Sequence, residues 1–312
     1  MPMLLTQPHA GEIKSAEFHL YQLILAAGES ARVELQADKA QLSLALLSTN
    51  NELIAATSES NAPGVQRLDI VAEDATTYLL RVTIERSQST TAQYRLTLQD
   101  KHAATAVDRE RFALHQLDTE IARLYQQRKT PALQQAAAKG REAGSRWLAL
   151  NEWSRAGAVL SLTGQCYRLL DDFLHARQAL TEALALQRRV GERQASVDTI
   201  TELGLLHAHS GEYQEALDCF DEAYQLARAT GFTEGVLASL DLLGVTCKYI
   251  GDFDKGRAVY QQLLDQAGKL PDRARTRYET QALIGLGIVA RAKREYPLAT
   301  DYLSRALKKR GS

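Results

Sequence analysis

A thiol and two imidazoles are the residues of this sequence most able to perform covalent chemistry. A nucleophilic cysteine needs a nearby histidine to raise its thiolate fraction, and His207, His209 and Cys247 offer that combination. However, His207 and Cys247 are forty positions apart, which is the period of an internal repeat, and Tyr167 and Ala290 occupy the same place in the neighbouring copies. A position that accepts Tyr, His, Cys and Ala is typical of packing, so we expect no catalytic site there and no enzymatic activity in this chain.

Metal and cofactor chemistry is not indicated either. His207 and His209 are two residues apart, and side chains at that spacing point in different directions on a helix. The three cysteines, Cys166, Cys219 and Cys247, are widely spaced and odd in number, which fits neither a disulfide framework nor a zinc cluster. No glycine-rich phosphate loop follows an expected strand. We therefore expect no metal and no cofactor.

Composition and charge narrow the classes of partner. The 312 residues carry a formal net charge of −1. Proteins that bind nucleic acid or anionic lipid usually have an excess of basic residues, so we expect neither as a partner. No apolar run reaches the roughly 18 residues of a membrane span. The segment Met1–Leu5 is too short for a signal peptide, which favours the cytoplasm and leaves export open if a signal precedes these residues.

The forty-residue repeat itself is carried by small residues. Glycines recur in the first half of each copy, at Gly164, Gly204, Gly244 and Gly287, and small residues recur in the second half, at Ala176, Ala216, Gly256 and Ala299 and then at Ala183, Ala223 and Ala306. This spacing predicts helical hairpins whose two backbones approach closely. One hairpin cannot bury its apolar face alone, so the copies are expected to stack as a right-handed α-solenoid. The copies cover about residues 157–196, 197–236, 237–279 and 280–312, after a degenerate first copy at about 113–153.

These residues resemble the tetratricopeptide repeat (TPR), although the period is forty residues instead of thirty-four. The resemblance implies a concave groove lined by the first helix of each hairpin, which holds a peptide or a partner protein. The groove positions it implies are Ser161, Gln165, Arg168, Asp198, Thr201, His209, Asp241, Lys248, Tyr249 and Arg291. This set is polar and of mixed charge, and a merely solvated inner face is the alternative.

The first hundred residues have a different rhythm. Apolar residues recur at every second position in Ala31–Ala37, Leu42–Leu46, Tyr78–Ile84 and Tyr94–Leu98, which is the pattern of strands with one buried face. Turn signals such as Asn61–Gly64 separate them. About seven strands without an intervening helix predict an antiparallel β-sandwich at 1–102, followed by the helical domain at 103–312.

Three phrases of this region resemble the bacterial pre-peptidase C-terminal type of β-sandwich. They are Glu17–Leu23, Thr77–Val82 and Ala92–Leu96. The resemblance implies an accessory module without catalytic residues of its own.

The order of the two parts also resembles the front of bacterial proteins in which such repeats precede a CHAT domain, a caspase-like cysteine peptidase. It implies a non-catalytic scaffold that forms the sensing or regulatory part of such a peptidase. The repeat pattern runs through Ala306 without a polar capping helix, so a further domain or a partner is expected to cover that end. The alternative is a free-standing adaptor whose sandwich binds a ligand such as a glycan.

Overall fold

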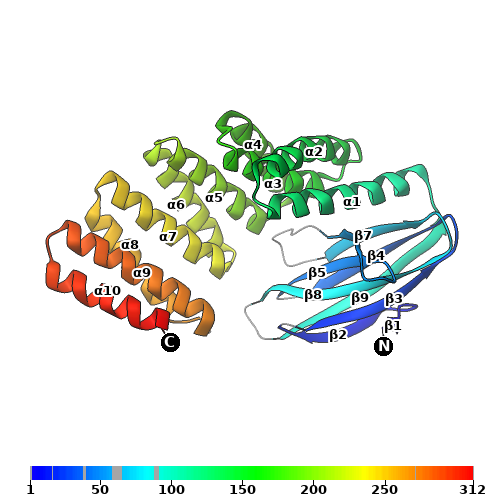
Figure 1. The fold of residues 1–312 in the computed structure, drawn as a ribbon, viewed down its shortest axis with the longest axis horizontal. Coiled ribbons are helices and arrows are strands. Elements are labelled where there is room, and N and C mark those ends of the chain that lie inside the picture. The colour runs from blue at the N-terminus through cyan, green and yellow to red at the C-terminus, as the bar shows by residue number, and fades with distance from the viewer. Residues whose placement is uncertain are drawn as a thin grey trace. The chain divides into compact units, whose positions relative to one another are not determined.

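The computed structural model describes residues 2–15, 17–37, 40–57, 65–87, 91–270 and 272–311. These residues form two compact units, 1–192 and 193–312. The expected turn at Asn61–Gly64 lies outside the described residues. Nine strands precede ten helices in the described part (Figure 1). The change from strand to helix falls between Ala103 and Ala106.

The strands form two sheets. Their bounds are β1 Met3–Leu4, β2 His9–Lys14, β3 Phe18–Leu25, β4 Glu29–Ala37, β5 Ala40–Leu47, β6 Leu53–Ala56, β7 Val65–Ala72, β8 Thr76–Ser87 and β9 Thr91–Ala103. One sheet has the order β1-β3-β8-β5-β6 and the other β2-β9-β4-β7. All neighbours are antiparallel except the short β1, which runs parallel to β3. The alternating apolar residues of both sheets share one core, in which Val33 and Leu96 of one sheet and Leu44 and Leu80 of the other are fully buried. The predicted sandwich is therefore confirmed.

The helices pack as consecutive hairpins. Their bounds are α1 Ala106–Gln126, α2 Thr130–Ala149, α3 Trp153–Leu169, α4 Phe173–Val190, α5 Arg193–His209, α6 Tyr213–Ala229, α7 Thr233–Ile250, α8 Phe253–Ala267, α9 Asp272–Ala292 and α10 Tyr296–Gly311. α3, α5 and α7 each begin one turn before the predicted start of their repeat. The prediction placed the starts too late because the first turn of these helices carries none of the repeated small residues. The predicted hairpin architecture is confirmed.

The repeated glycines lie where the predicted close approach requires them. A Cβ added to Gly204 on α5 would lie 2.5 Å from the ring of Phe220 on α6, and one added to Gly164 would lie 2.5 Å from Leu180. Cβ atoms do not approach other atoms so closely. The turns repeat as well: Gly191 and Gly231 follow the ends of α4 and α6 with φ of +77° and +68°, a left-handed conformation that glycine adopts at no steric cost.

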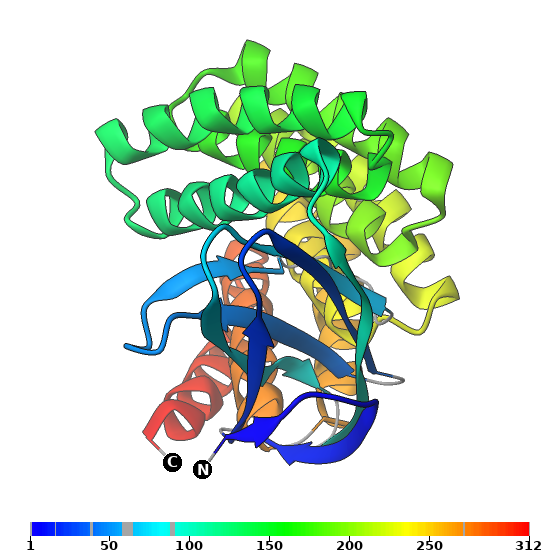
Figure 2. The same cartoon turned by 90° about the vertical axis from the view of Figure 1, so that its right-hand side faces the viewer.

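Within the first unit, α1 joins the helices to the sheets. It packs on β6 and β7, which are edge strands of different sheets, and so lies across the opening between them (Figure 2). The hydroxyl of Thr119 on α1 accepts a hydrogen bond of 2.8 Å from the Ala56 amide of β6. A capping box formed by Thr105 and Asp108 starts the helix, which satisfies amides that would otherwise have no partner. The bond from Ala56 to Thr119 thus pairs one backbone amide at the edge of β6.

Candidate partner-binding surface

The predicted groove residues are divided between the two units. Three lie on α3 of the first unit, and seven lie on α5, α7 and α9 of the second, where α7 contacts both α5 and α9. The residues of the second unit are Asp198 and Thr201 on α5, His209 at its end, Asp241, Lys248 and Tyr249 on α7, and Arg291 on α9. The first helices of these hairpins therefore lie next to one another, as a shared surface requires.

The end of α7 presents the most exposed of these side chains. Tyr249 is 64% exposed, and its ring stacks on Tyr213 of α6, with centroids 5.7 Å apart and planes 1° from parallel. The Lys248 ammonium lies 5.1 Å from the Tyr249 ring centroid. An exposed aromatic pair beside a cation is the kind of anchor that protein interfaces favour. Sequence reasoning missed Tyr213, although an aromatic residue begins the second helix of each full hairpin, at Phe173, Tyr213, Phe253 and Tyr296.

Asp241 supplies a partly buried negative charge on the same helix. Burial raises the pKa of this carboxyl, while the charges of Arg277 and Lys248 act in the opposite direction. Arg277 lies on α9 and was not predicted. α9 is longer than α3, α5 and α7, and it begins at Asp272, well before its predicted start. Asp241 on α7 and Arg277 on α9 therefore carry opposite charges on neighbouring helices.

Other predicted residues already bind their own helix. The Thr201 hydroxyl donates to the carbonyl of Val197 at 2.8 Å, and Nδ1 of His209 lies 2.7 Å from the carbonyl oxygen of Leu205, to which it donates. Asp198 is half-buried and Arg291 is exposed. Thr201 is thus the weaker candidate for contacting a partner, because its hydroxyl donor is used.

The three residues of α3 are more internal. Ser161 is buried, and Arg168 is half-buried. The side-chain oxygen of Gln165 accepts a 2.7 Å hydrogen bond from the Tyr125 hydroxyl of α1, while the Arg128 guanidinium covers the Tyr125 ring at 4.0 Å. Ser161 and Gln165 are therefore part of the packing of the first unit.

The thiol and imidazole considered at the outset do not form an activated pair. Cys247 is fully buried, and burial raises the pKa of its thiol, which disfavours the reactive thiolate. Nδ1 of His207 lies 2.6 Å from a carboxylate oxygen of Glu212. In the described part of the chain, no group of three or more His, Cys, Asp or Glu residues is placed to hold a metal ion.

A buried polar cluster in the first unit was missed by sequence reasoning. Asp69 on β7 binds Arg32 on β4, with Nη2 2.7 Å from Oδ1, and its Oδ2 lies 3.4 Å from Nε2 of His115 on α1. Burial would raise the pKa of Asp69, but His115 and Arg32 outweigh it and lower this pKa to about 2. Burial lowers the pKa of His115 to about 4, against the opposing effect of Asp69. A carboxylate, a guanidinium and a neutral imidazole thus link the sandwich to α1.

A second buried acid lies one turn along α1. Oδ2 of Asp118 accepts a 3.0 Å hydrogen bond from the indole nitrogen of Trp147 on α2. Burial raises the pKa of Asp118 to about 7, although Arg155 and the Trp147 bond act against it. Arg155, on α3, donates to the carbonyl of Arg67 on β7. Side chains of α1 and α3 therefore bind strand β7, and Trp147 of α2 binds the same part of α1.

Comparisons with known proteins agree with the helical fold. Residues 195–269 match the tetratricopeptide repeat family model. The chain is similar to the crystal structure of BtubC (BKLC) from P. vanneervenii, with a TM-score of 0.54 and 18% identity over 67% of this chain and 92% of that one. It is also similar to TPR-like repeats of a putative kinesin light chain from Podosopora anserina, with a TM-score of 0.53 and 17% identity over 64% of this chain and 95% of that one. No curated protein matches the sequence.

A third comparison concerns the sheets. The pre-peptidase C-terminal domain of a collagenase from Bacillus anthracis aligns with 31% of this chain and 92% of that domain, with a TM-score of 0.27 and 12% identity. The described helices include none that is long and apolar enough to cross a bilayer. The chain thus combines a two-sheet β region with a TPR-type helical region, a type of repeat that generally serves as a scaffold for protein interactions.

Proposed function

We propose that the chain is a non-catalytic binding module whose helices α5, α7 and α9 hold an extended peptide or a partner protein. The observation that carries this proposal is the end of α7, where Tyr249 is exposed on Tyr213 beside Lys248. Asp241 and Arg277 add opposite charges on neighbouring helices. An extended peptide could lay its side chains against the aromatic pair and satisfy its charges on both helices.

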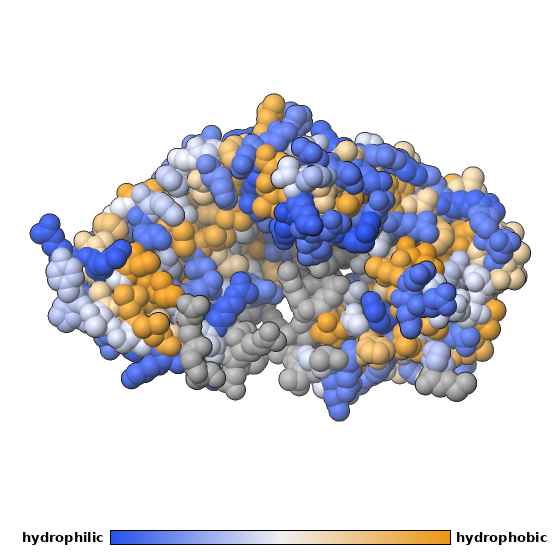
Figure 3. All heavy atoms as spheres, viewed as in Figure 1, coloured by the Kyte–Doolittle hydropathy of each residue, from blue (hydrophilic) through white to orange (hydrophobic). Residues whose placement is uncertain are grey.

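The larger role proposed is that of the sensing or regulatory part of a CHAT-type cysteine peptidase. The order of a pre-peptidase-like sandwich at 1–102 and forty-residue repeats at 103–312 supports it. The last helix, α10, exposes Tyr296, Leu298 and Leu307, and hydrophobic residues occur among polar ones over the last helices of the visible face (Figure 3). In this proposal a following domain covers that helix, and partner capture changes how the hairpins stack against it.

Peptide selection tests the binding surface. Peptides selected from a displayed random library against the full chain should lose at least 10-fold in affinity when Lys248→Ala and Tyr249→Ala are combined. The exposed residues Asp221 and Gln225 on α6 supply the matched control, Asp221→Ala with Gln225→Ala, which should leave the affinity unchanged. Melting temperatures of both variants should equal that of the parent. Peptides that bind the Lys248 and Tyr249 variant equally well would remove this surface from the proposal.

The peptidase role has a separate test. The coding region after Ser312 should specify a domain with a histidine followed by glycine and a later cysteine nucleophile. An unrelated domain there contradicts the peptidase role and leaves the binding role intact. The glycan-binding alternative predicts hits for the full chain on a glycan array, whereas the proposed scaffold predicts none.

A further inference from the structure

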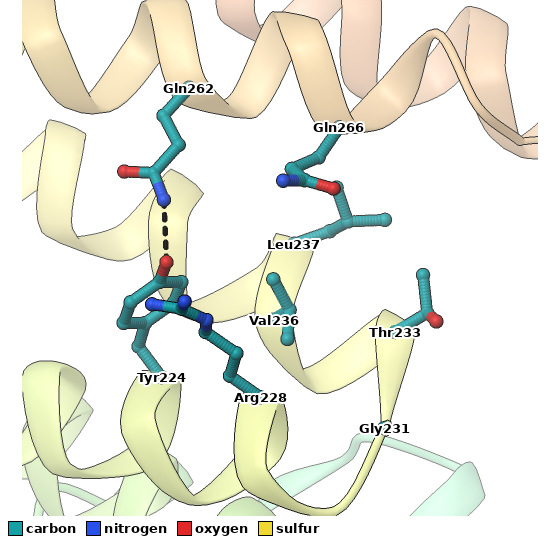
Figure 4. A pocket seen from close by; sticks show the side chains of 8 residues that line it. All are labelled: Tyr224, Arg228, Gly231, Thr233, Val236, Leu237, Gln262 and Gln266. Carbon is teal, nitrogen blue, oxygen red and sulfur yellow. Dashed lines mark hydrogen bonds between the residues drawn. The ribbon is translucent and has the colours of Figure 1, made fainter.

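The second unit contains a cavity that the proposed peptide surface does not use. It has a volume of about 290 Å³ and lies between α6, α8 and the first turns of α7 (Figure 4). Thr233 begins α7 at this cavity, whereas Tyr249 lies at the other end of the same helix. The rise of an α-helix places these two residues roughly 24 Å apart. The cavity is therefore a separate candidate site.

Three polar side chains point hydrogen-bond donors into this space. The Tyr224 hydroxyl of α6, in a residue only 8% exposed, accepts a 2.5 Å bond from Nε2 of Gln262 on α8, so its own hydrogen is directed elsewhere. The side-chain oxygen of Gln266 accepts from Lys269 at 3.4 Å, which turns the amide nitrogen toward the cavity (Figure 4). Arg228 extends from α6 along Tyr224 toward Gln262 (Figure 4).

Among the side chains that line the cavity, the charged one is basic, Arg228. No acidic side chain lines it, and within the described part of the chain no ion pair engages Arg228. The start of α7 adds the positive end of a helix dipole. Phe232 provides no side-chain cap there, and the acidic residue of this turn, Glu234, does not line the cavity. Donors without matching acceptors, together with an unpaired guanidinium, favour an anion.

The walls indicate which anion. Val236 and Leu237 form an apolar side of the cavity, which suits a short carbon chain. A guanidinium matches a carboxylate in a planar, two-bond arrangement. The volume is at the small end of ligand sites, which hold roughly 300–1,000 Å³. We propose that this cavity binds a carboxylate carried on a short aliphatic chain, with Arg228, Gln266 and Tyr224 as donors. The source is either a free small acid or a glutamate side chain of a partner.

Binding here would bridge two hairpins. Tyr224 and Arg228 belong to the hairpin of α5 and α6, whereas Gln262 and Gln266 belong to that of α7 and α8. The stability of repeat proteins depends on such interfaces between neighbouring hairpins, and a ligand that binds only the folded state stabilises it by mass action. The ligand should therefore raise the melting temperature of the full chain.

The experiment titrates the full chain with glutarate and follows backbone amides by NMR. Glutarate should shift the amides of Gly231 and Thr233 and raise the melting temperature, while the neutral match glutaramide and inorganic phosphate should bind at least 10-fold more weakly. Arg228→Gln should weaken glutarate binding at least 10-fold, and Tyr224→Phe should weaken it several-fold. Arg188→Gln is the matched control, because it removes the same charge from the equivalent position of α4.

The peptides acetyl-Gly-Glu-Gly-amide and acetyl-Gly-Gln-Gly-amide distinguish the two sources. Binding of the glutamate peptide alone supports a partner's side chain, whereas binding of glutarate without the glutamate peptide supports a free acid. Equal binding of glutarate and glutaramide, equal binding of phosphate, or unchanged glutarate affinity in Arg228→Gln overturns the proposal. The combined Lys248→Ala and Tyr249→Ala variant should bind glutarate normally, which separates this site from the proposed peptide surface.

Discussion

The contacts inside the first unit differ in kind from those inside the second. In the first, buried charged and polar groups join different elements. Asp69 of β7 binds Arg32 of β4 and His115 of α1, and Asp118 of α1 binds Trp147 of α2. In the second, helix meets helix through glycines and aromatic rings, as at Gly204 and Phe220, and its ion pairs include the exposed pair of Asp301 and Arg305. Hairpins of similar shape can stack by repeating the same contact. A sheet and a helix have no such common shape, so hydrogen bonds and ion pairs between particular residues fix their relative position instead.

This comparison predicts that removing one charge costs far more in the first unit than in the second. Asp69→Ala should lower the free energy of unfolding by about 3 kcal/mol, because it leaves the Arg32 guanidinium, only about one-third exposed, without its partner. Both tryptophans of the chain, Trp147 and Trp153, lie in the first unit, so urea unfolding followed by fluorescence reports on that unit.

The matched control is Asp301→Ala, which breaks the exposed pair of Asp301 and Arg305 on α10. Pairs of this kind contribute less than about 1 kcal/mol. The free energy of unfolding of this variant, measured by circular dichroism, should therefore differ from that of the parent by about 0.5 kcal/mol at most. Equal costs for the two variants would contradict the comparison.

The buried acid Asp118 should make the first unit respond to pH. Its folded pKa, about 7, is above the unfolded value of about 3.9. The group therefore contributes stability at low pH that is lost as pH rises toward 7. Relative to the parent, the free energy of unfolding of Asp118→Asn should rise by roughly 2–3 kcal/mol between pH 5 and pH 7.5. Tryptophan fluorescence in urea at the two pH values measures this difference.

His115 acts with the opposite sign and serves as an internal check. Its folded pKa is lowered to about 4, so the stability it contributes is lost as pH falls from about 6.5 to 4. Because His115 is present in both the parent and the Asp118→Asn variant, its effect cancels in their difference. A difference that does not change with pH would show that Asp118 titrates normally.

The glycine contacts of the second unit give a smaller effect. Gly204→Ala should lower the free energy of unfolding by about 2 kcal/mol, since the new Cβ would displace the Phe220 ring. In Gly256→Ala the new Cβ would meet nothing nearer than 3.4 Å, and alanine favours the helix, so stability should rise by up to about 1 kcal/mol. Circular dichroism during urea unfolding tests both. A similar loss of stability in the two variants would contradict the claim that the close contact at Gly204 requires glycine.

The same contrast explains what could be predicted from sequence. Hairpins repeat one local pattern, so Gly164 and Gly204 identify their crossing points, and alternation in Ala31–Ala37 identifies β4. The pairing of Asp69 with His115 joins residues 46 positions apart in different elements, and no local pattern records it. One signal was present: Asp69 interrupts the apolar strand β7, and the register of β4 and β7 places it opposite Arg32.

The repeat register predicts only some of the residues that surround Tyr249, and whether they bind a partner stays a prediction. Lys248 and Tyr249 follow from the repeat register, and the structure brings them together with Tyr213. Arg277 could not be placed, because extra residues in its hairpin shift the register and lengthen α9 at its start. Ser161 and Gln165 have the right repeat positions, but α1 packs beside α3 and Tyr125 takes up Gln165. Register alone does not show which neighbour covers a position.

The left-handed turns at Gly191 and Gly231 give the helical region a property that a single domain with one core lacks. Both turns end a helix in the same way and start the next at the same step, so the segment between them can be copied. A duplicate of residues 193–232 inserted after Phe232 would begin and end at the same kind of turn as the original and would repeat its pattern of small residues. Chain length can thus change by whole hairpins without a new core, and the area offered to a partner grows with each addition.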